Sequence, residues 1–176
     1  MRYAAFLLGI NVGGNRKVPM ADLKILFEKT LKFSEVKTLL NSGNVVFEAA
    51  KADASMIEKA VAKRFGFDVG VILRTLDELR ALERGEPFKG IPVTKDTRLY
   101  VTFRGDATAK GTLKAPYVSP DKSFRILRIG KGEIVSVLTV GEKGGRTVDA
   151  MAVLGKEFGK KLTTRNWNTI EKILAP

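Results

Sequence analysis

The glycine-rich segment at residues 9–17 holds the first residues that could bind a ligand. It joins an apolar run to a predicted helix and ends on the basic pair Arg16 and Lys17. Glycines tolerate positive φ and let a ligand approach backbone N–H groups, and a nearby cation then suits a phosphate. The alternative is a turn that needs glycine only for its shape. We assign to this candidate site Asn11, Gly13, Gly14, Asn15 and Arg16.

Two further polar segments lie at residues 41–44 and 163–169. The first is a strong hairpin-turn signal, and the second contains the single tryptophan of the chain. Arginine and asparagine side chains can bind an anion or an amide-bearing ligand. The alternative for the second segment is structural, with Thr164 capping a helix that Trp167 anchors in the core. The candidate binding residues here are Ser42, Asn44, Arg165, Asn166, Trp167 and Asn168.

A third candidate surface lies on a predicted strand in which basic and aromatic residues alternate with apolar ones. If the polar face of this strand is accessible, its arginines can meet phosphates and its tyrosine ring can stack on a base. The alternative is that these positions are ordinary solvated ones, or that the face packs against other parts of the protein. This candidate nucleic-acid-binding surface comprises Arg98, Tyr100, Arg104, Arg125 and Arg128.

The composition excludes several kinds of chemistry. The chain has no cysteine and no histidine, which removes cysteine nucleophiles, serine–histidine pairs, disulfides and the common zinc sites. Only Asp, Glu, Lys and Tyr remain for acid–base catalysis, and no carboxylate pair stands out by its spacing. We therefore assign no catalytic residue, metal or cofactor, and whether the protein is an enzyme stays open.

The charge of the chain favours negatively charged partners. Among its 176 residues are 31 Lys and Arg against 19 Asp and Glu, a formal net charge of +12. Such a field attracts nucleic acid or phosphorylated small molecules, although it also promotes solubility. No apolar run approaches the ~20 residues that span a bilayer. We expect a cytoplasmic protein without membrane insertion, since Met1-Arg2 is too short for the charged region of a signal peptide.

Apolar periodicity predicts a mixed α/β (α+β) fold. Residues 1–84 show the order strand, helix, strand, strand, helix, strand, which is that of a ferredoxin-like unit. Residues 85–95 contain two prolines and two glycines and are the predicted linker. Residues 96–176 echo the first half and add a C-terminal helix. We therefore expect two ferredoxin-like βαββαβ halves packed together.

Within this fold, three local signals predict where helices begin and end. The pair Ser55 and Glu58 predicts a capping box, and Gly66 predicts the end of the same helix. Thr75 and Glu78 predict the start of a short third helix.

Three segments together resemble one known family. The segments 9–14 (GINVGG), 42–47 (SGNVVF) and 164–169 (TRNWNT) resemble the opening, hairpin and closing motifs of the bacterial domain of unknown function numbered sixteen-ninety-seven. The resemblance implies an α/β fold of two ferredoxin-like halves. It implies no activity, ligand or catalytic residue.

Three functions remain open from the sequence. The leading hypothesis is a basic binding module for an anionic ligand: nucleic acid, a nucleotide or a phosphorylated metabolite. The first alternative is a small-molecule enzyme whose site is built from the turns of Asn11, Asn44 and Arg165. The second is a structural or interaction protein in which these motifs serve only the fold. The oligomeric state and the identity of the ligand stay open.

Overall fold

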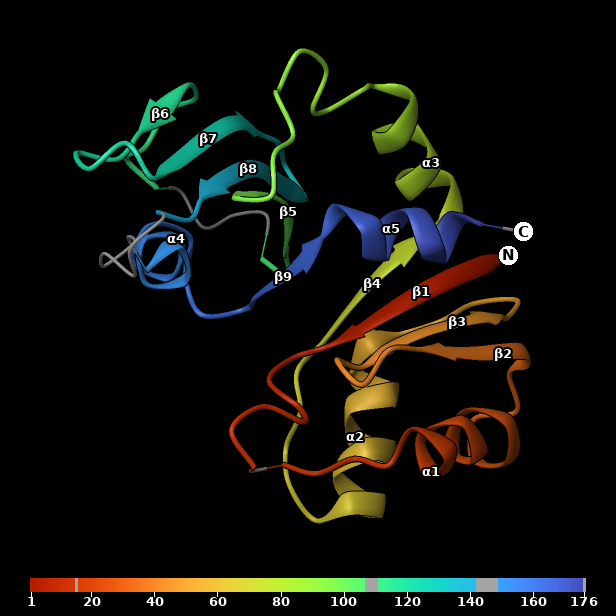
Figure 1. Ribbon diagram of the computed structural model, residues 1–176. Coiled ribbons are helices and arrows are strands. Elements are labelled where there is room, and N and C mark those ends of the chain that lie inside the picture. Colours follow the sequence, from red (N-terminus) through yellow and green to blue (C-terminus); the bar gives the residue numbers. More distant parts are fainter. Residues whose placement is uncertain (15, 107–110, 142–148, 176) are drawn as a thin grey trace. The chain divides into compact units, whose positions relative to one another are not determined.

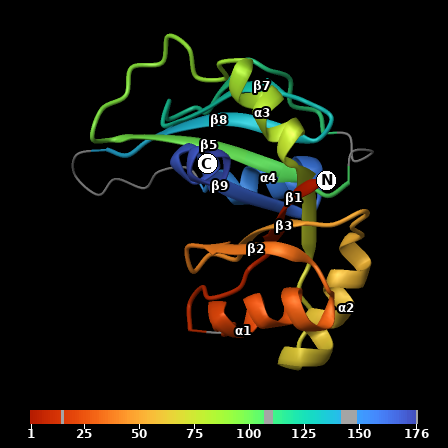
Figure 2. The same ribbon diagram turned by 90° about the vertical axis from the view of Figure 1, so that its right-hand side faces the viewer.

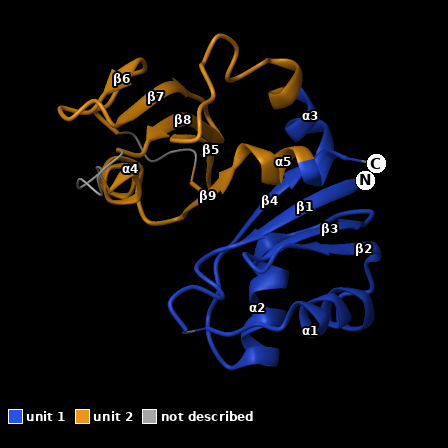
Figure 3. Cartoon of the chain, in the orientation of Figure 1, with its two compact units in different colours: residues 1–81, 172–176 blue, residues 82–171 orange. Residues whose placement is uncertain are grey.

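The computed structural model (Figure 1) describes residues 1–14, 16–106, 111–141 and 149–175. The chain divides into two compact units, coloured in Figure 3: unit 1 comprises residues 1–81 and 172–176, and unit 2 comprises residues 82–171. Each unit contains one antiparallel sheet with helices, which confirms the predicted α+β fold class. No helix among the described residues has the length and apolar character needed to cross a membrane.

Unit 1 has the predicted ferredoxin-like order. Its sheet runs β2-β3-β1-β4, with every neighbouring pair antiparallel. In Figure 1, α1 and α2 cover one face of this sheet. The elements are β1 (Arg2–Leu7), α1 (Met20–Ile25), a π-helical turn η1 (Leu26–Thr30), β2 (Ser34–Leu39), β3 (Asn44–Glu48), α2 (Ala54–Phe65), β4 (Val71–Thr75) and α3 (Leu76–Arg84), which continues into unit 2.

The continuous apolar run of β1 is explained by its place between β3 and β4. Ala5 and Leu7 point into the core beneath the helices, which also contains Leu23, Phe27 and Ile57. The alternate residues Ala4 and Phe6 are also buried. Both faces of this central strand are therefore covered, so an apolar residue is required at each successive position.

The start of α2 differs from the prediction. Asp53, not Ser55, is the N-cap, and its Oδ1 accepts a hydrogen bond of 2.7 Å from the N–H of Ser55. Glu58 turns away from the helix start, because its Oε1 accepts from the N–H of Val71 in β4 at 2.8 Å. The predicted capping box is thus wrong. Gly66 ends the helix with φ of 81°, as predicted.

Unit 2 repeats the strand order of unit 1 and adds one strand, β6, at the edge of its sheet. Its sheet runs β6-β7-β8-β5-β9, so β7, β8, β5 and β9 occupy the places of β2, β3, β1 and β4 (Figure 2). The described residues between β5 and β7 form no helix, and this segment contains Pro116 and Pro120, which lack the N–H that a helix needs. The elements are β5 (Thr97–Arg104), β6 (Tyr117–Val118), β7 (Phe124–Ile129), β8 (Glu133–Thr139), α4 (Ala150–Phe158), β9 (Leu162–Asn166) and α5 (Trp167–Leu174), which continues into unit 1.

The start of α5 is also corrected. Thr164 lies inside β9, where it pairs with Thr102 of β5, and the helix begins three residues later at Trp167. The hydroxyl groups of Thr164 and Thr102 are 2.7 Å apart. Thr164 is therefore a strand residue whose side chain bonds across the sheet, and it caps no helix.

Candidate ligand-binding sites

The glycine-rich loop of unit 1 is closed by the side chain of Asn11. The Nδ2 of Asn11 donates to the carbonyl of Val18 at 2.9 Å, and the N–H of Val18 donates to the Oδ1 of Asn11 at 2.8 Å. The backbone N–H of Asn11 also donates to the carbonyl of Arg16 at 3.2 Å. The side chain thus acts like a strand partner for Val18 and fixes the two ends of the loop.

Asn11 also joins this loop to the 41–44 turn. Its Nδ2 donates a second hydrogen bond, of 2.8 Å, to the carbonyl of Asn41. From the other side, the N–H of Leu7 donates to the carbonyl of Gly43 at 2.9 Å. The first two sequence motifs are therefore neighbours in the structure.

Within the turn, Asn44 and Gly43 have structural roles. Asn44 is fully buried, and its Nδ2 donates to the carbonyl of Leu39 at 2.9 Å and to the hydroxyl of Ser42 at 3.0 Å. Gly43 has φ of 77°, and a Cβ placed on it would lie 2.7 Å from Cδ1 of Ile10. The turn packs this closely on the loop because Gly43 has no side chain.

A pocket of about 390 Å³ opens where the loop meets the turn. Its lining residues are Asn11, Gly14, Lys17, Val18, Pro19, Met20 and Asn41. Lys17 is the only charged side chain among them, and none of them carries a carboxylate. We call this the loop pocket.

The basic pair beside the loop pocket is exposed and uncompensated. Arg16 and Lys17 are both solvent-exposed, and neither forms an ion pair with a residue that the structure describes. Gly13 and Gly14 are exposed, and their φ angles are 63° and 79°. Because glycine has no side chain, these residues do not cover their own backbone N–H groups. The predicted site residue Asn15 lies outside the described residues.

The third polar segment belongs to unit 2 and includes a buried arginine. Arg165 is 8% exposed, and its Nη1 donates to the hydroxyl of Thr163 at 2.6 Å and to the carbonyl of Thr164 at 3.0 Å. Burial lowers the pKa of Arg165 to about 10, so the guanidinium stays protonated at neutral pH. Whether the turns of Asn11, Asn44 and Arg165 share one site stays a prediction.

The neighbours of Arg165 differ in exposure. Asn166 and Asn168 are exposed, whereas Trp167 is half-buried. The ring of Trp167 meets that of Phe88 edge to face, with centroids 5.4 Å apart. Trp167 therefore has a packing role within unit 2, in line with the structural alternative for this segment.

The polar face of β5 is covered by α4. Arg104 is 7% exposed, its guanidinium carbon is 5.0 Å from the ring centroid of Phe158, and its Nη1 donates to the carbonyl of Gly130 at 3.0 Å. Thr102 on the same face is fully buried. The expectation of an accessible face is wrong at these two positions, because the sequence does not reveal which face the helix covers.

The other members of the predicted nucleic-acid surface are dispersed. Arg98 is exposed and Tyr100 is half-buried. Tyr100, Ser136 and Ile126 are paired across three neighbouring strands and share one face of the sheet. Arg125 pairs with Val137, the residue after Ser136, so it points to the opposite face. Arg128 is exposed and lies 3.9 Å from Glu133 in an ion pair. These residues do not form one continuous surface.

Five residues that line the loop pocket are not among the site residues assigned from the sequence: Lys17, Val18, Pro19, Met20 and Asn41. Of these, Lys17 is considered there only as part of the basic pair at the end of the loop. Asn41 contributes its backbone carbonyl to the bond with Asn11, and a carbonyl leaves no signal in residue type. Among the described residues, no group of three or more His, Cys, Asp or Glu side chains is placed to hold a metal ion.

Fold and strand order define a two-unit α+β protein in which a ferredoxin-like arrangement of four strands occurs twice. The chain belongs to the family described as "Protein of unknown function (DUF1697)", whose family model matches residues 1–132. This match includes both motifs that form the loop pocket and ends before the 163–169 segment.

The structure is similar to that of a conserved bacterial protein, SP0830 from Streptococcus pneumoniae. The TM-score is 0.71 at 25% sequence identity, over 98% of this chain and 96% of that one. No curated protein matches the sequence. The relatives therefore establish the fold and the family, and they bring no activity.

Proposed function

We propose that the protein binds a phosphate-bearing anion in the loop pocket. The observation that supports this proposal is the charge of the lining: among the lining residues that the structure describes, Lys17 is the only charged one and none carries a carboxylate. A cation that lacks an acidic partner gains most from an incoming anion, because no existing ion pair has to be broken first.

The loop offers the groups that phosphate recognition needs. Lys17 is a mobile ammonium donor, Arg16 lies next to it in the chain, and exposed glycines bring backbone N–H groups to the surface. Asn11 bonds only to backbone groups in this region, so it acts as a positioning residue that fixes the two ends of the loop. The net charge of +12 increases the local concentration of anions around the whole chain.

The volume of the loop pocket favours a small ligand. About 390 Å³ lies within the ~300–1,000 Å³ of typical small-molecule sites. A nucleotide or a phosphorylated metabolite can place its phosphates against Lys17, and a nucleic-acid backbone presents the same chemical group. The proposal therefore names the shared chemistry, and the binding experiment distinguishes these sources.

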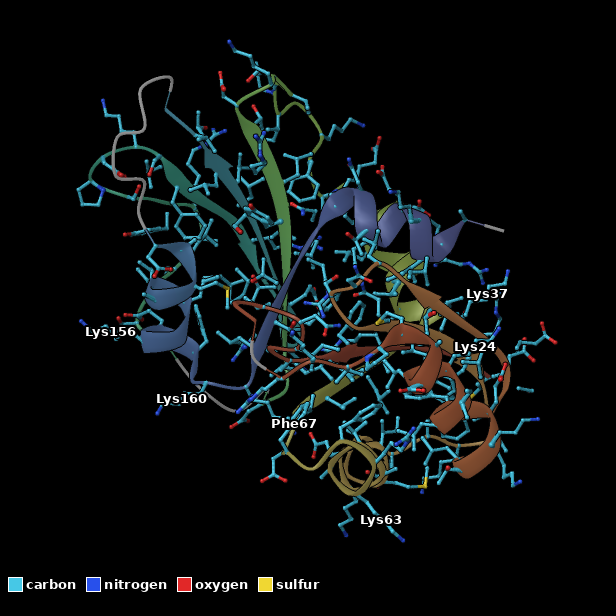
Figure 4. The ribbon with its side chains drawn as sticks, turned by 60° about the horizontal axis from the view of Figure 1, so that its bottom comes forward. Lys24, Lys37, Lys63, Phe67, Lys156 and Lys160 are labelled. Carbon is cyan, nitrogen blue, oxygen red and sulfur yellow. The ribbon has the colours of Figure 1, made fainter. Side chains whose placement is uncertain are left out.

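Three other lysines of unit 1 lie on separate elements. Lys24, Lys37 and Lys63 come from α1, β2 and α2, and Figure 4 shows their side chains projecting outward from these separate elements. Lys63 is exposed and lies in the last turn of α2. It is a suitable control because its removal changes the net charge by the same amount as removal of Lys17.

The test measures affinity by isothermal titration calorimetry for pyrophosphate, a nucleoside triphosphate and a single-stranded oligonucleotide. The double variant Arg16→Gln/Lys17→Gln should bind the preferred ligand about tenfold or more weakly, since one charge-assisted hydrogen bond contributes about 1.5–3 kcal/mol. The control Lys59→Gln/Lys63→Gln carries the same net charge and should bind within about twofold of wild type.

Two outcomes contradict the proposal. Equal loss of affinity in both double variants would mean that binding follows overall charge and not the loop pocket. No binding of any of the three ligands at about 50 mM salt would mean that the protein is not an anion-binding module at all.

A structural role for the motifs is the second candidate, and a specific observation favours it. The amide groups of Asn11 and Asn44 donate to carbonyls of Val18, Asn41 and Leu39, which hold backbone segments together. This observation also weakens the enzyme alternative, because the side chain of Asn44 is fully buried and cannot reach a substrate. The two candidates differ at Lys17, which only ligand binding requires.

A further inference from the structure

A second pocket lies within unit 2, between the sheet and the first two turns of α4. It encloses about 380 Å³. Its floor consists of strand residues from β5, β8 and β9, and its wall consists of residues from the start of α4. We call it the α4 pocket.

The floor of the α4 pocket carries hydroxyl groups from three adjacent strands. Tyr100 and Ser136 are partners across β5 and β8, and Thr102 and Thr164 are partners across β5 and β9. Thr164 donates its hydroxyl proton to the sulfur of Met151, so in its 2.7 Å contact with Thr102 it must be the acceptor. The oxygen of Thr102 therefore keeps lone pairs that can accept from a ligand.

Ser136 is the most informative of these residues. It is 1% exposed and lines the pocket. A hydrogen bond between this hydroxyl and a ligand group would form away from bulk water, where such bonds are stronger. Ser136 can both donate to and accept from such a group.

The rest of the lining decides the character of the ligand. Leu138, Ala150, Met151 and Leu154 form an apolar wall. Among the lining residues that the structure describes, the only charged one is Asp149, whose Oδ1 accepts from the N–H of Ala152 at 3.0 Å as the N-cap of α4. An anion in this pocket would therefore meet a carboxylate.

We propose that the α4 pocket binds a small, largely apolar molecule that carries no negative charge and presents a hydroxyl or amide group to Ser136 and Thr102. Its apolar body lies against Leu138 and Leu154, and its hydrogen-bonding group reaches the floor. This pocket belongs to unit 2 and the loop pocket to unit 1, and their linings differ in chemistry. It stands on its own observations, whatever the outcome for phosphate binding.

The experiment uses 2-naphthol as the neutral probe and 2-naphthoate as its anionic counterpart. Binding is followed by amide chemical shifts of the full-length protein in two-dimensional NMR. 2-Naphthol should shift the amides of Tyr100, Ser136 and Ala150–Leu154, whereas 2-naphthoate should bind at least about tenfold more weakly at this site.

Two alanines of α4 offer a matched pair of variants. Ala150 lines the pocket and is half-buried, while Ala152 on the same helix is exposed. Ala150→Leu fills part of the cavity and should weaken 2-naphthol binding about tenfold, whereas Ala152→Leu should change it less than about twofold. Thermal unfolding of both variants establishes that each is folded.

A second variant removes the buried hydroxyl without filling space. Ser136→Ala should weaken 2-naphthol about three- to tenfold and leave the affinity for naphthalene unchanged, because naphthalene cannot form the hydrogen bond. The proposal is overturned if Ala150→Leu and Ala152→Leu bind alike, if 2-naphthoate binds as tightly as 2-naphthol, or if Ser136→Ala leaves both affinities unchanged.

Discussion

Asn11 and Val18 exchange two hydrogen bonds, of 2.9 and 2.8 Å, through the side chain of one and the backbone of the other. The same Nδ2 reaches the carbonyl of Asn41, 30 residues further along the chain. One amide group therefore satisfies three backbone groups and holds together two of the three motifs that stand out in the sequence. The shape of the loop pocket depends on this residue.

The first prediction concerns that residue. Asn11→Ala should lower the free energy of unfolding by about 2–3 kcal/mol, since three hydrogen bonds are lost, two of which are partly buried. Asn41→Ala is the control, because only the backbone carbonyl of Asn41 takes part, and it should change stability by less than about 0.5 kcal/mol. Urea denaturation followed by circular dichroism measures both. Equal effects would show that the side chain of Asn11 does not hold the loop.

The second prediction separates backbone strain from packing at two glycines. Gly43 and Gly66 have φ of 77° and 81°, but only at Gly43 would a Cβ meet other atoms, Cδ1 and Cγ1 of Ile10 at 2.7 and 2.9 Å. Gly66→Ala should cost about 1–2 kcal/mol of stability from the left-handed conformation alone. Gly43→Ala should cost about 1–3 kcal/mol more through overpacking. Similar losses at both sites, measured by thermal unfolding, would contradict the close packing of the turn on the loop.

The third prediction assigns Arg104 to the core of unit 2. Arg104→Ala should destabilise the protein by about 2–4 kcal/mol, since it removes a charged hydrogen bond and the contact with Phe158 and leaves a cavity. Arg98→Ala on the same strand removes an exposed side chain and should cost less than about 1 kcal/mol. Chemical denaturation gives both values. If Arg104→Ala leaves the stability unchanged, Arg104 is not a core residue and is again a candidate for ligand binding.

The fourth prediction concerns the acid limb of stability. Hydrogen bonds from the hydroxyl of Thr112, and then from the backbone N–H groups of Leu113 and Thr112, hold the pKa of Glu157 below its ordinary 4.5. The unfolded chain therefore takes up this proton first as the pH falls, so the folded state loses the contribution of Glu157 between pH 4.5 and its lower folded pKa.

The comparison for Glu157 is with Glu157→Gln. The variant should be less stable than wild type at about pH 7, and the gap should close as the pH falls toward about 3, because only the wild type gains a proton there. Melting temperatures across this range test the prediction. A gap that stays constant at all pH values would show that the contribution of Glu157 to stability does not depend on its ionisation.

Much of unit 1 could be predicted because its local signals agree with its packing. The apolar run of β1 is buried on both faces, and the polar 41–44 turn joins β2 to β3 as expected. At α3, the N–H of Thr75 donates to Glu78 and the N–H of Glu78 donates to Thr75, which is the reciprocal bonding of a capping box at the helix start that the sequence predicts there.

The same motif failed at α2, and the reason is tertiary. Glu58 accepts from Val71, a residue 13 positions away in β4, while Asp53 supplies the cap instead. The side chains of Asp53 and Glu58 can both accept from N–H groups at the helix start. The sequence does not show that Glu58 will instead accept from the N–H of a strand residue. Local motifs predict which groups can bond, and the packing of distant elements decides which do.

The candidate site was predictable in part for a similar reason. The glycines and basic residues of the 9–17 loop indicated a possible anion site, but the bond from Asn11 to Asn41 depends on the fold. Arg104 shows the opposite error, because a basic residue in an alternating strand suggested an accessible face that α4 covers. Residue type indicates chemistry, and burial determines whether that chemistry reaches solvent.

The most direct test of phosphate binding is an NMR titration of the full-length protein with pyrophosphate at about 50 mM salt. We expect saturable shifts concentrated at the amides of residues 11–18, 20 and 41, with the amides around the α4 pocket unchanged. The same titration of Arg16→Gln/Lys17→Gln should show these shifts weakened about tenfold or more. Small, non-saturating shifts spread over the lysines of both units would contradict the central claim, because they would mean that the positive charge of the chain attracts anions without a site.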